Sequence, residues 1–112
     1  MKVKRLPPTL KKRQRYVVFE VAGEETFKKE EVYKSLASTG IKALGEIGFA
    51  GLGFWLTDFD ENKQKGILKI NHDQKDQAKA LLALASTVNG KPARFSSMGV
   101  SGTIKKAKKK WW

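Results

Sequence analysis

Basic side chains are concentrated at the two ends of the chain. Their type and spacing are the clearest functional signal in the sequence. The 112 residues include 23 lysines and arginines against 11 acidic residues, a formal net charge of +12. Twelve of these basic residues lie in segments 1–15 and 105–112, which contain no acid, so the intervening body is electrically balanced. Such confined charge repels itself and favours an anionic partner, for which RNA is the natural candidate. The predicted RNA-binding residues are Lys4, Arg5, Lys11, Lys12, Arg13, Arg15, Lys105, Lys106, Lys108, Lys109 and Lys110.

Residues that could form a catalytic or metal-binding site are sparse. The absence of cysteine excludes disulfides, thiolate metal sites and cysteine nucleophiles, and His72 is the only histidine. The run Asp58–Asn62 begins like a calcium-binding loop, but lysines stand where that loop needs glycine and glutamate. We therefore expect no catalytic residue, no metal site and no cofactor in this chain, and a polar hairpin tip over 60–63.

A glycine-rich run, Gly45–Gly53, contains two G-x-x-G spacings. This spacing occurs in loops that clamp a nucleic-acid backbone between two helices, but here it leads into a strand, which favours a flexible loop. Its apolar side chains form a predicted protein interface: Ile47, Phe49 and Leu52.

The apolar pattern predicts the elements that must position these side chains. We expect strands over 15–21, 52–59, 64–71 and 92–100, with Val17, Phe19 and Val21 on the core face of the first. A first helix is predicted from an N-cap at Thr26 to about Leu44, bending or ending early at Gly40. A second helix is predicted from Asp73 to Asn89-Gly90. Ser101-Gly102-Thr103 ends the last strand and can cap a short basic helix from Ile104.

This order is typical of an α+β fold of the RRM-like, ferredoxin-like split βαβ type. That fold is a four-stranded antiparallel sheet with two helices on one face, here followed by a C-terminal basic helix. We expect a basic extended arm over 1–14, a domain over 15–100 and a basic helix or tail over 101–112. Because the first and last strands of this arrangement are antiparallel neighbours, both basic ends should leave at one edge of the sheet and form one patch.

The RRM scaffold usually binds single-stranded RNA by stacking bases on aromatic side chains of its sheet. Whether this chain has aromatic residues at those positions therefore decides whether it can bind RNA in the same way. Lys65-Gly66 matches the first two places of that motif, but Ile67 and Lys69 stand at the aromatic places. We therefore expect recognition of structured RNA through its shape and phosphates. Trp111 and Trp112 could stack on bases or pack against the body or a partner.

No stretch approaches the roughly 20 apolar residues of a membrane span. No apolar stretch follows the charged N-terminus either, as a signal peptide would require. We therefore expect no membrane association and a cytoplasmic location.

Four stretches give the chain a resemblance to a known family: Val3–Leu10, Arg15–Glu20, Lys63–Ile67 and Gly99–Lys105. On these residues the chain resembles the archaeal ribonuclease P protein component 2, the Pop-five-type subunit family, over essentially its whole length. The resemblance implies an RRM-like subunit of the ribonucleoprotein that removes the 5′ leader from precursor tRNA. In that particle the RNA carries the chemistry through bound magnesium, so the chain would have no catalytic residues of its own.

The same resemblance implies the partners. They are the catalytic domain of ribonuclease P RNA, the TIM-barrel-like ribonuclease P protein component 3, and a second copy of the chain within a dimer of heterodimers. Precursor tRNA would be met only indirectly. The alternative is a non-catalytic protein–protein scaffold whose basic ends bind RNA without specificity.

Overall fold

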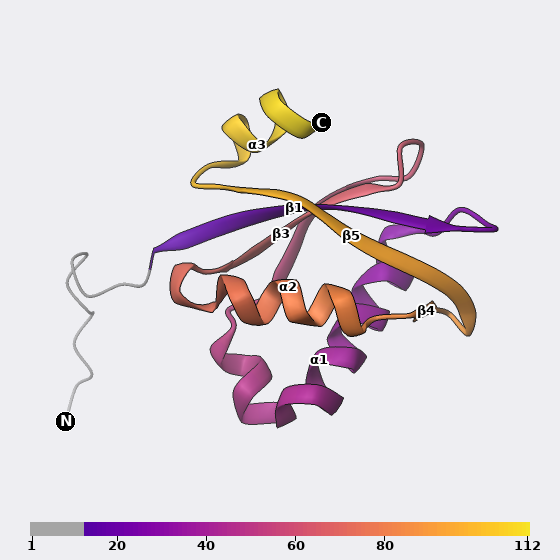
Figure 1. Ribbon diagram of the computed structural model, residues 1–112, viewed down its shortest axis with the longest axis horizontal. Coiled ribbons are helices and arrows are strands. Elements are labelled where there is room, and N and C mark those ends of the chain that lie inside the picture. Colours follow the sequence, from indigo (N-terminus) through magenta and orange to yellow (C-terminus); the bar gives the residue numbers. More distant parts are fainter. Residues whose placement is uncertain (1–12) are drawn as a thin grey trace.

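A five-stranded antiparallel sheet lies between two helices on one face and a third helix on the other (Figure 1). The computed structural model describes residues 13–112. Residues 1–12 of the predicted extended arm (1–14), with the RNA-binding residues Lys4, Arg5, Lys11 and Lys12, lie outside the described residues, whereas Gln14 belongs to the first strand. The elements are β1 (Gln14–Gly23), α1 (Lys29–Gly51), β2 (Trp55–Asp60), β3 (Lys65–Asn71), α2 (Lys75–Leu84), β4 (Thr87–Val88), β5 (Lys91–Ser101) and α3 (Ile104–Trp111).

The strand order is β2-β3-β1-β5-β4, with β1 at the centre. The α+β class and the antiparallel pairing of the first and last long strands, β1 and β5, agree with the sequence prediction. The sheet has five strands rather than the predicted four. The extra strand, β4, is only two residues long and pairs with the start of β5.

The extra strand exists because α2 ends at Leu84, earlier than predicted. Asn89 and Gly90 do not end a helix. They form the two-residue turn between β4 and β5, with φ angles of 53° and 78°. Two-residue hairpin turns of type I′ require positive φ at both positions, which asparagine and glycine tolerate best. The Asn-Gly pair was therefore a hairpin signal that the helical interpretation missed.

The main core lies between the sheet and the pair α1 and α2. Val17, Phe19 and Val21 of β1 are buried there, as predicted, beside Leu36 of α1 and Leu82 of α2. A second, smaller core lies on the opposite face, beneath α3. A helix therefore packs on each face of the sheet, and β1 is apolar on both sides of its centre.

Helix α1 is longer than predicted and begins later, with its N-cap at Lys28 rather than Thr26. It continues through Gly40 and kinks at Gly45, where φ is 75°. The glycine-rich stretch expected to be a loose loop is thus helical through Gly51. Phe49 folds back so closely that a Cβ on Gly40 would lie 2.5 Å from its ring, so Gly40 is required for this contact.

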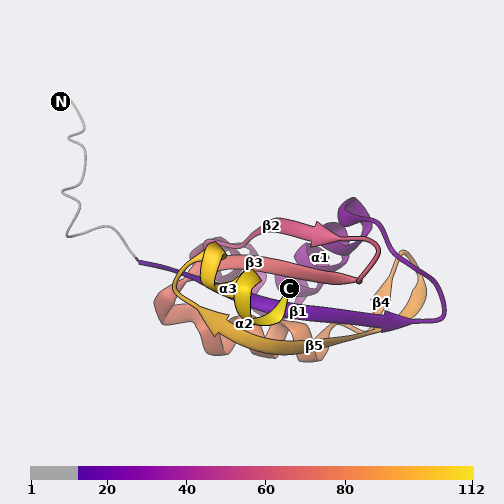
Figure 2. The same ribbon diagram turned by 90° about the horizontal axis from the view of Figure 1, so that it is seen from above.

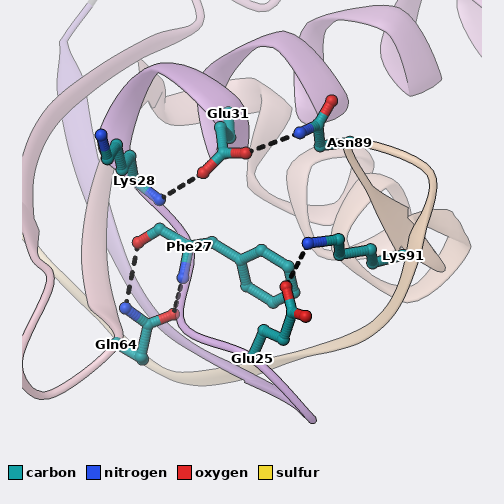
Figure 3. Close-up of polar contacts among 7 residues, drawn as sticks. All are labelled: Glu25, Phe27, Lys28, Glu31, Gln64, Asn89 and Lys91. Atoms are coloured by element: carbon teal, nitrogen blue, oxygen red, sulfur yellow. Dashed lines mark hydrogen bonds and ion pairs between the residues drawn. The ribbon is translucent and has the colours of Figure 1, made fainter.

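The loop between β1 and α1 is held by polar contacts with distant segments (Figure 3). The Gln64 side chain accepts a hydrogen bond from the backbone N–H of Phe27 at 2.9 Å and donates to the Phe27 carbonyl at 3.1 Å. The Glu31 carboxylate accepts from the backbone N–H of Lys28 and from the amide of Asn89, at 3.0 and 2.8 Å. The β2–β3 turn and the β4–β5 turn are therefore both tied to the start of α1.

The carboxylate of Glu25 also lies in this loop. Glu25 pairs with Lys91, and this hydrogen bond and the opposite charge raise the pKa of the Lys91 ammonium above its usual value (Figure 3).

Within residues 13–112, every helix is too short or too polar to cross a lipid bilayer.

Candidate nucleic-acid interface

Helix α3 carries the basic residues of the C-terminal segment, and its start is well defined. The Thr103 hydroxyl accepts a hydrogen bond from the backbone N–H of Lys106 at 3.2 Å, as an N-cap residue does. The Ser101 side chain bonds to the Thr103 backbone and shapes the turn before the helix. The helix predicted from Ile104 is therefore present, with the predicted capping signal.

Three side chains of α3, spaced i, i+3 and i+7, pack onto the sheet. Ala107 is fully buried against Val18 and Ile67, and Ile104 and Trp111 pack on the same cluster. This spacing was an amphipathic signal within the lysine-rich stretch, and its partner was the apolar outer face of β1 and β3. Packing against the body was one of the alternatives offered for Trp111, and the structure shows it. The sequence did not identify Val18 and Ile67 as the surface that receives the helix.

The C-terminal end of α3 is bound by lysines of the β2–β3 hairpin. Lys63 Nζ donates to the carbonyl of Trp112 at 2.8 Å, and Lys65 Nζ donates to the carbonyl of Trp111 at 3.1 Å. Lysine ammonium groups at a helix C-terminus donate hydrogen bonds to the last carbonyls, which have no partner within the helix. Their positive charge also interacts favourably with the negative end of the helix dipole. The ion pair between Lys108 and Asp58 of β2, at 2.6 Å, adds a further link to the edge of the sheet.

These contacts divide the α3 lysines into two groups. Lys108 is engaged with Asp58, whereas four other lysines are exposed on the outer side of the helix: Lys105, Lys106, Lys109 and Lys110. Lys110 also lies 5.0 Å from the centroid of the Trp111 ring. Helix α3 lies over the sheet (Figure 2), and these four lysines place a group of cations on its outer side.

The start of β1 lies at the same end of the sheet as the start of α3. Tyr16 pairs with Ser101, which places Arg13 and Arg15 near the turn that leads into α3. The Arg13 carbonyl accepts a hydrogen bond from the backbone N–H of His72, the first residue of a 3₁₀ turn that precedes α2. Helix α3 then carries Lys109 and Lys110 away from this end, toward the β2–β3 hairpin.

The residues predicted as a protein interface separate in the structure. Ile47 is 91% exposed, Phe49 is half-buried against Phe54, and Leu52 is completely buried. Leu52 thus belongs to the interior and supports the kinked segment from within. Ile41, Leu44 and Leu84 are also exposed apolar residues of α1 and α2, and sequence reasoning did not select them.

In the part of the chain that the structure describes, no cluster of three or more His, Asp or Glu side chains could hold a metal ion. The outer sheet face around Ile67 is packed under α3 and does not offer an open platform of rings. The arrangement of this face supports phosphate binding by α3.

Comparison with known proteins gives consistent matches. The family model described as the Rpp14/Pop5 family matches residues 15–112. The chain is 39% identical over 110 residues to a ribonuclease P protein component 2 of Thermococcus gammatolerans, covering 98% of this chain and 92% of that protein. It is 39% identical to the protein of that name in Pyrococcus furiosus, covering 96% and 90%, and 33% identical to that of Methanosarcina mazei, covering 97% and 92%.

A solved structure also resembles this one. A chain of a cryo-EM structure of yeast ribonuclease MRP superimposes with a TM-score of 0.68 at 14% sequence identity. The match covers 82% of this chain and 76% of that chain, and it shows a shared fold.

Proposed function

The chain belongs to the Rpp14/Pop5 family and is a ribonuclease P protein subunit, and we propose that α3 and the start of β1 form its RNA-binding surface. The resemblance drawn from the four sequence stretches is thereby confirmed. The proposed task is to support the catalytic RNA while that RNA, with bound magnesium, removes the 5′ leader of precursor tRNA. The chain itself contributes no catalytic group in this proposal.

The observation that carries the proposal is the docking of α3. Four lysines of this helix are exposed, while its other face, its C-terminal carbonyls and Lys108 are all bound to the body. A group of cations on a fixed helix loses little conformational freedom when it meets phosphates, so more of its electrostatic attraction remains as affinity. Arg13 and Arg15, near the turn that leads into α3, belong to the proposed surface, and Lys4, Arg5, Lys11 and Lys12 remain predicted RNA contacts.

Neutralised phosphates explain how a non-catalytic subunit would help the RNA. Where RNA strands fold closely together, their phosphates repel one another and magnesium ions reduce that repulsion. Lysines held on a helix would replace part of this counterion atmosphere. The subunit should therefore lower the magnesium concentration at which the RNA is active.

The proposed protein contacts lie away from α3. Ile41, Leu44, Ile47 and Leu84 are exposed by 42%, 37%, 91% and 60%, and they belong to α1 and α2 on the other side of the sheet. We assign this apolar surface to protein partners, namely ribonuclease P protein component 3 and a second copy of the chain in a dimer of heterodimers. An RRM-like split βαβ description of the fold and a cytoplasmic location also belong to this proposal.

The test is reconstitution of ribonuclease P from its RNA and protein subunits, with and without this chain. Cleavage of precursor tRNA is measured across a magnesium titration. We expect the chain to shift the midpoint to lower magnesium, and we expect the pure chain alone to leave precursor tRNA intact. An unchanged midpoint would reject the proposed support of the RNA.

The exposed apolar surface favours one alternative, a protein–protein scaffold whose basic residues bind RNA without specificity. In that case the magnesium midpoint would depend on the partner subunit and would be insensitive to the α3 lysines. Substituting those lysines in the reconstituted particle separates the two functions.

A further inference from the structure

Trp55 is a large aromatic residue at the outer edge of the sheet that no part of the proposed RNA surface uses. It begins β2, an outermost strand (Figure 2), and is 55% exposed. Its ring contacts Tyr33 of α1 edge-on, with centroids 5.7 Å apart and planes at 63°. An indole held by a neighbouring ring yet largely exposed to solvent is a typical arrangement for stacking on a ligand.

A shallow, mainly apolar groove lies between this edge strand and the first half of α1. Its lining consists of two lysines, one acid and three apolar or aromatic residues: Lys29, Lys34, Glu30, Tyr33, Trp55 and Leu56. Lysine side chains combine an apolar stem with a cationic tip, so they line such a groove with carbon and place charge at its rim. The groove therefore offers an apolar floor beside positive charge.

Positive charge also flanks Trp55 on its other side. Lys69 of β3 is its direct cross-strand partner, which places their Cβ atoms about 5 Å apart. The acids of β2 lie further along the strand, and Asp58 is paired with Lys108 of α3. Phosphates on either side of a group bound at Trp55 would thus meet Lys69 in one direction and Lys34 in the other.

The edge of β2 is poorly suited to a protein strand. The pairing of β2 with β3 shifts register between Leu56 and Asp58, an irregularity that disturbs the edge. Lys29 Nζ donates to the Thr57 carbonyl at 3.3 Å, so a side chain already occupies one of the backbone acceptors. An added strand would have to displace this lysine, whereas a stacked aromatic ring would not.

We propose that the groove at Trp55 and Tyr33 binds an unpaired nucleobase of RNA, stacked on the indole, with Lys34 and Lys69 on the flanking phosphates. This inference rests on the proposed RNA-binding function and adds a second kind of contact to it. The α3 lysines bind duplex phosphates without regard to base, whereas this groove requires a base free of its partner. The site would position the subunit at a bulge or loop.

The test uses the full chain and two RNA duplexes that differ at a single nucleotide. One duplex carries a bulged adenosine, and the other carries an abasic nucleotide at the same place, so their phosphates are equal in number. We expect the wild-type chain to bind the abasic duplex about ten-fold more weakly, as the loss of one base–aromatic stack predicts. The Trp55→Leu variant should bind both duplexes equally, with the salt dependence of the wild type.

Trp55→Phe serves as the matched control, since it keeps an aromatic ring at the same place in β2. It should retain the preference for the bulged adenosine. Because the two duplexes are compared on the wild-type chain first, the result does not depend on how well a variant folds.

Each other outcome has a clear meaning. Equal binding of both duplexes by the wild type overturns the base site and leaves the phosphate surface intact. Failure to bind either duplex overturns the proposed function and this site together. If Trp55→Leu alters only the mass of the protein assembly, the groove is a protein contact and the base site is rejected.

Discussion

The indole of Trp111 lies directly on the backbone of Gly99. A Cβ atom at Gly99 would lie 2.0 Å from Cζ2 of the Trp111 ring, closer than any real contact. Only a glycine in β5 lets α3 approach the sheet this closely, and the approach buries Ala107 between them. Gly99 is thus the docking position of the helix that carries the exposed lysines.

Gly99→Val should therefore displace Trp111 and loosen α3. We expect a loss of about 1–3 kcal/mol, the usual cost of forcing a side chain into a filled space. Tryptophan fluorescence should move to longer wavelength as the ring becomes exposed, and thermal unfolding gives the stability. Gly102→Ala is the control, because a Cβ there has no neighbour within 4 Å. An unshifted spectrum for Gly99→Val would show that the helix docks without this contact.

Substitution of the exposed α3 lysines tests their role directly. If about six basic residues of the chain meet phosphates, the log–log slope of affinity against salt should be about −5 for structured RNA. Changing Lys105, Lys106 and Lys109 to Gln should flatten this slope by about 2 to 3 while thermal stability stays nearly constant. Filter-binding titrations at several salt concentrations measure the slope.

The control removes three charges from the helices on the other face: Lys42, Lys75 and Lys79 to Gln. This variant matches the first in net charge, so a general effect of charge would flatten both slopes alike. Equal slopes for the two variants would remove α3 from the RNA-binding mechanism.

Gly40 gives a prediction in which helix propensity and packing oppose each other. Alanine is favoured over glycine inside a helix by about 1 kcal/mol. At Gly40, however, its Cβ would lie 2.5 Å from the Phe49 ring. We expect Gly40→Ala to lower the free energy of unfolding, whereas Gly51→Ala, which meets no atom within 4 Å, should not. Urea denaturation of both variants measures the two free energies of unfolding. Stabilisation by Gly40→Ala would mean that the Phe49 ring does not pack against Gly40.

Gln64 should be important for stability despite its place in a surface turn. Its side chain pairs with both backbone groups of Phe27, and a part-buried polar group left without a partner costs about 1–3 kcal/mol. Gln64→Ala should lower the free energy of unfolding by such an amount, as measured by chemical denaturation. Gln77→Ala, an exposed position in α2, should be close to neutral. Similar stabilities for the two variants would contradict the proposed clamp.

Ile47 tests the proposed protein surface. It is 91% exposed, so Ile47→Asp should leave the unfolding of the chain unchanged. We expect it to reduce the mass of the assembly formed with partner subunits, since a charge would be buried in an apolar contact. Sedimentation or mass photometry measures this change. Lys34→Asp, on the same helix but outside the apolar residues, is the control, and an unchanged mass for Ile47→Asp would place the contact elsewhere.

Three residues of the stretch Lys63–Ile67, one of the four that carry the family resemblance, have structural tasks. Gln64 clamps the start of α1, Lys65 binds the C-terminal end of α3, and Gly66 lies under the Phe19 ring, where a Cβ would be 2.4 Å away. Sequence reasoning had examined Lys65-Gly66 as a possible nucleic-acid motif. The structure uses both residues to hold elements together instead.

By itself the sequence determined what depends on neighbours along the chain. Alternation placed Val17, Phe19 and Val21 in the core, Thr103 identified the start of α3, and the charge count separated basic ends from a neutral body. These features follow from local periodicity, capping chemistry and composition, each of which is complete within a few residues.

Only the tertiary structure decided which surfaces these elements cover. The cover over Val18 and the groove at Trp55 both depend on residues far apart in sequence. Periodicity shows that a helix has an apolar face, but not which distant backbone will accept it. Helix α3 docks at Gly99, because a residue without a side chain leaves room for the indole of Trp111.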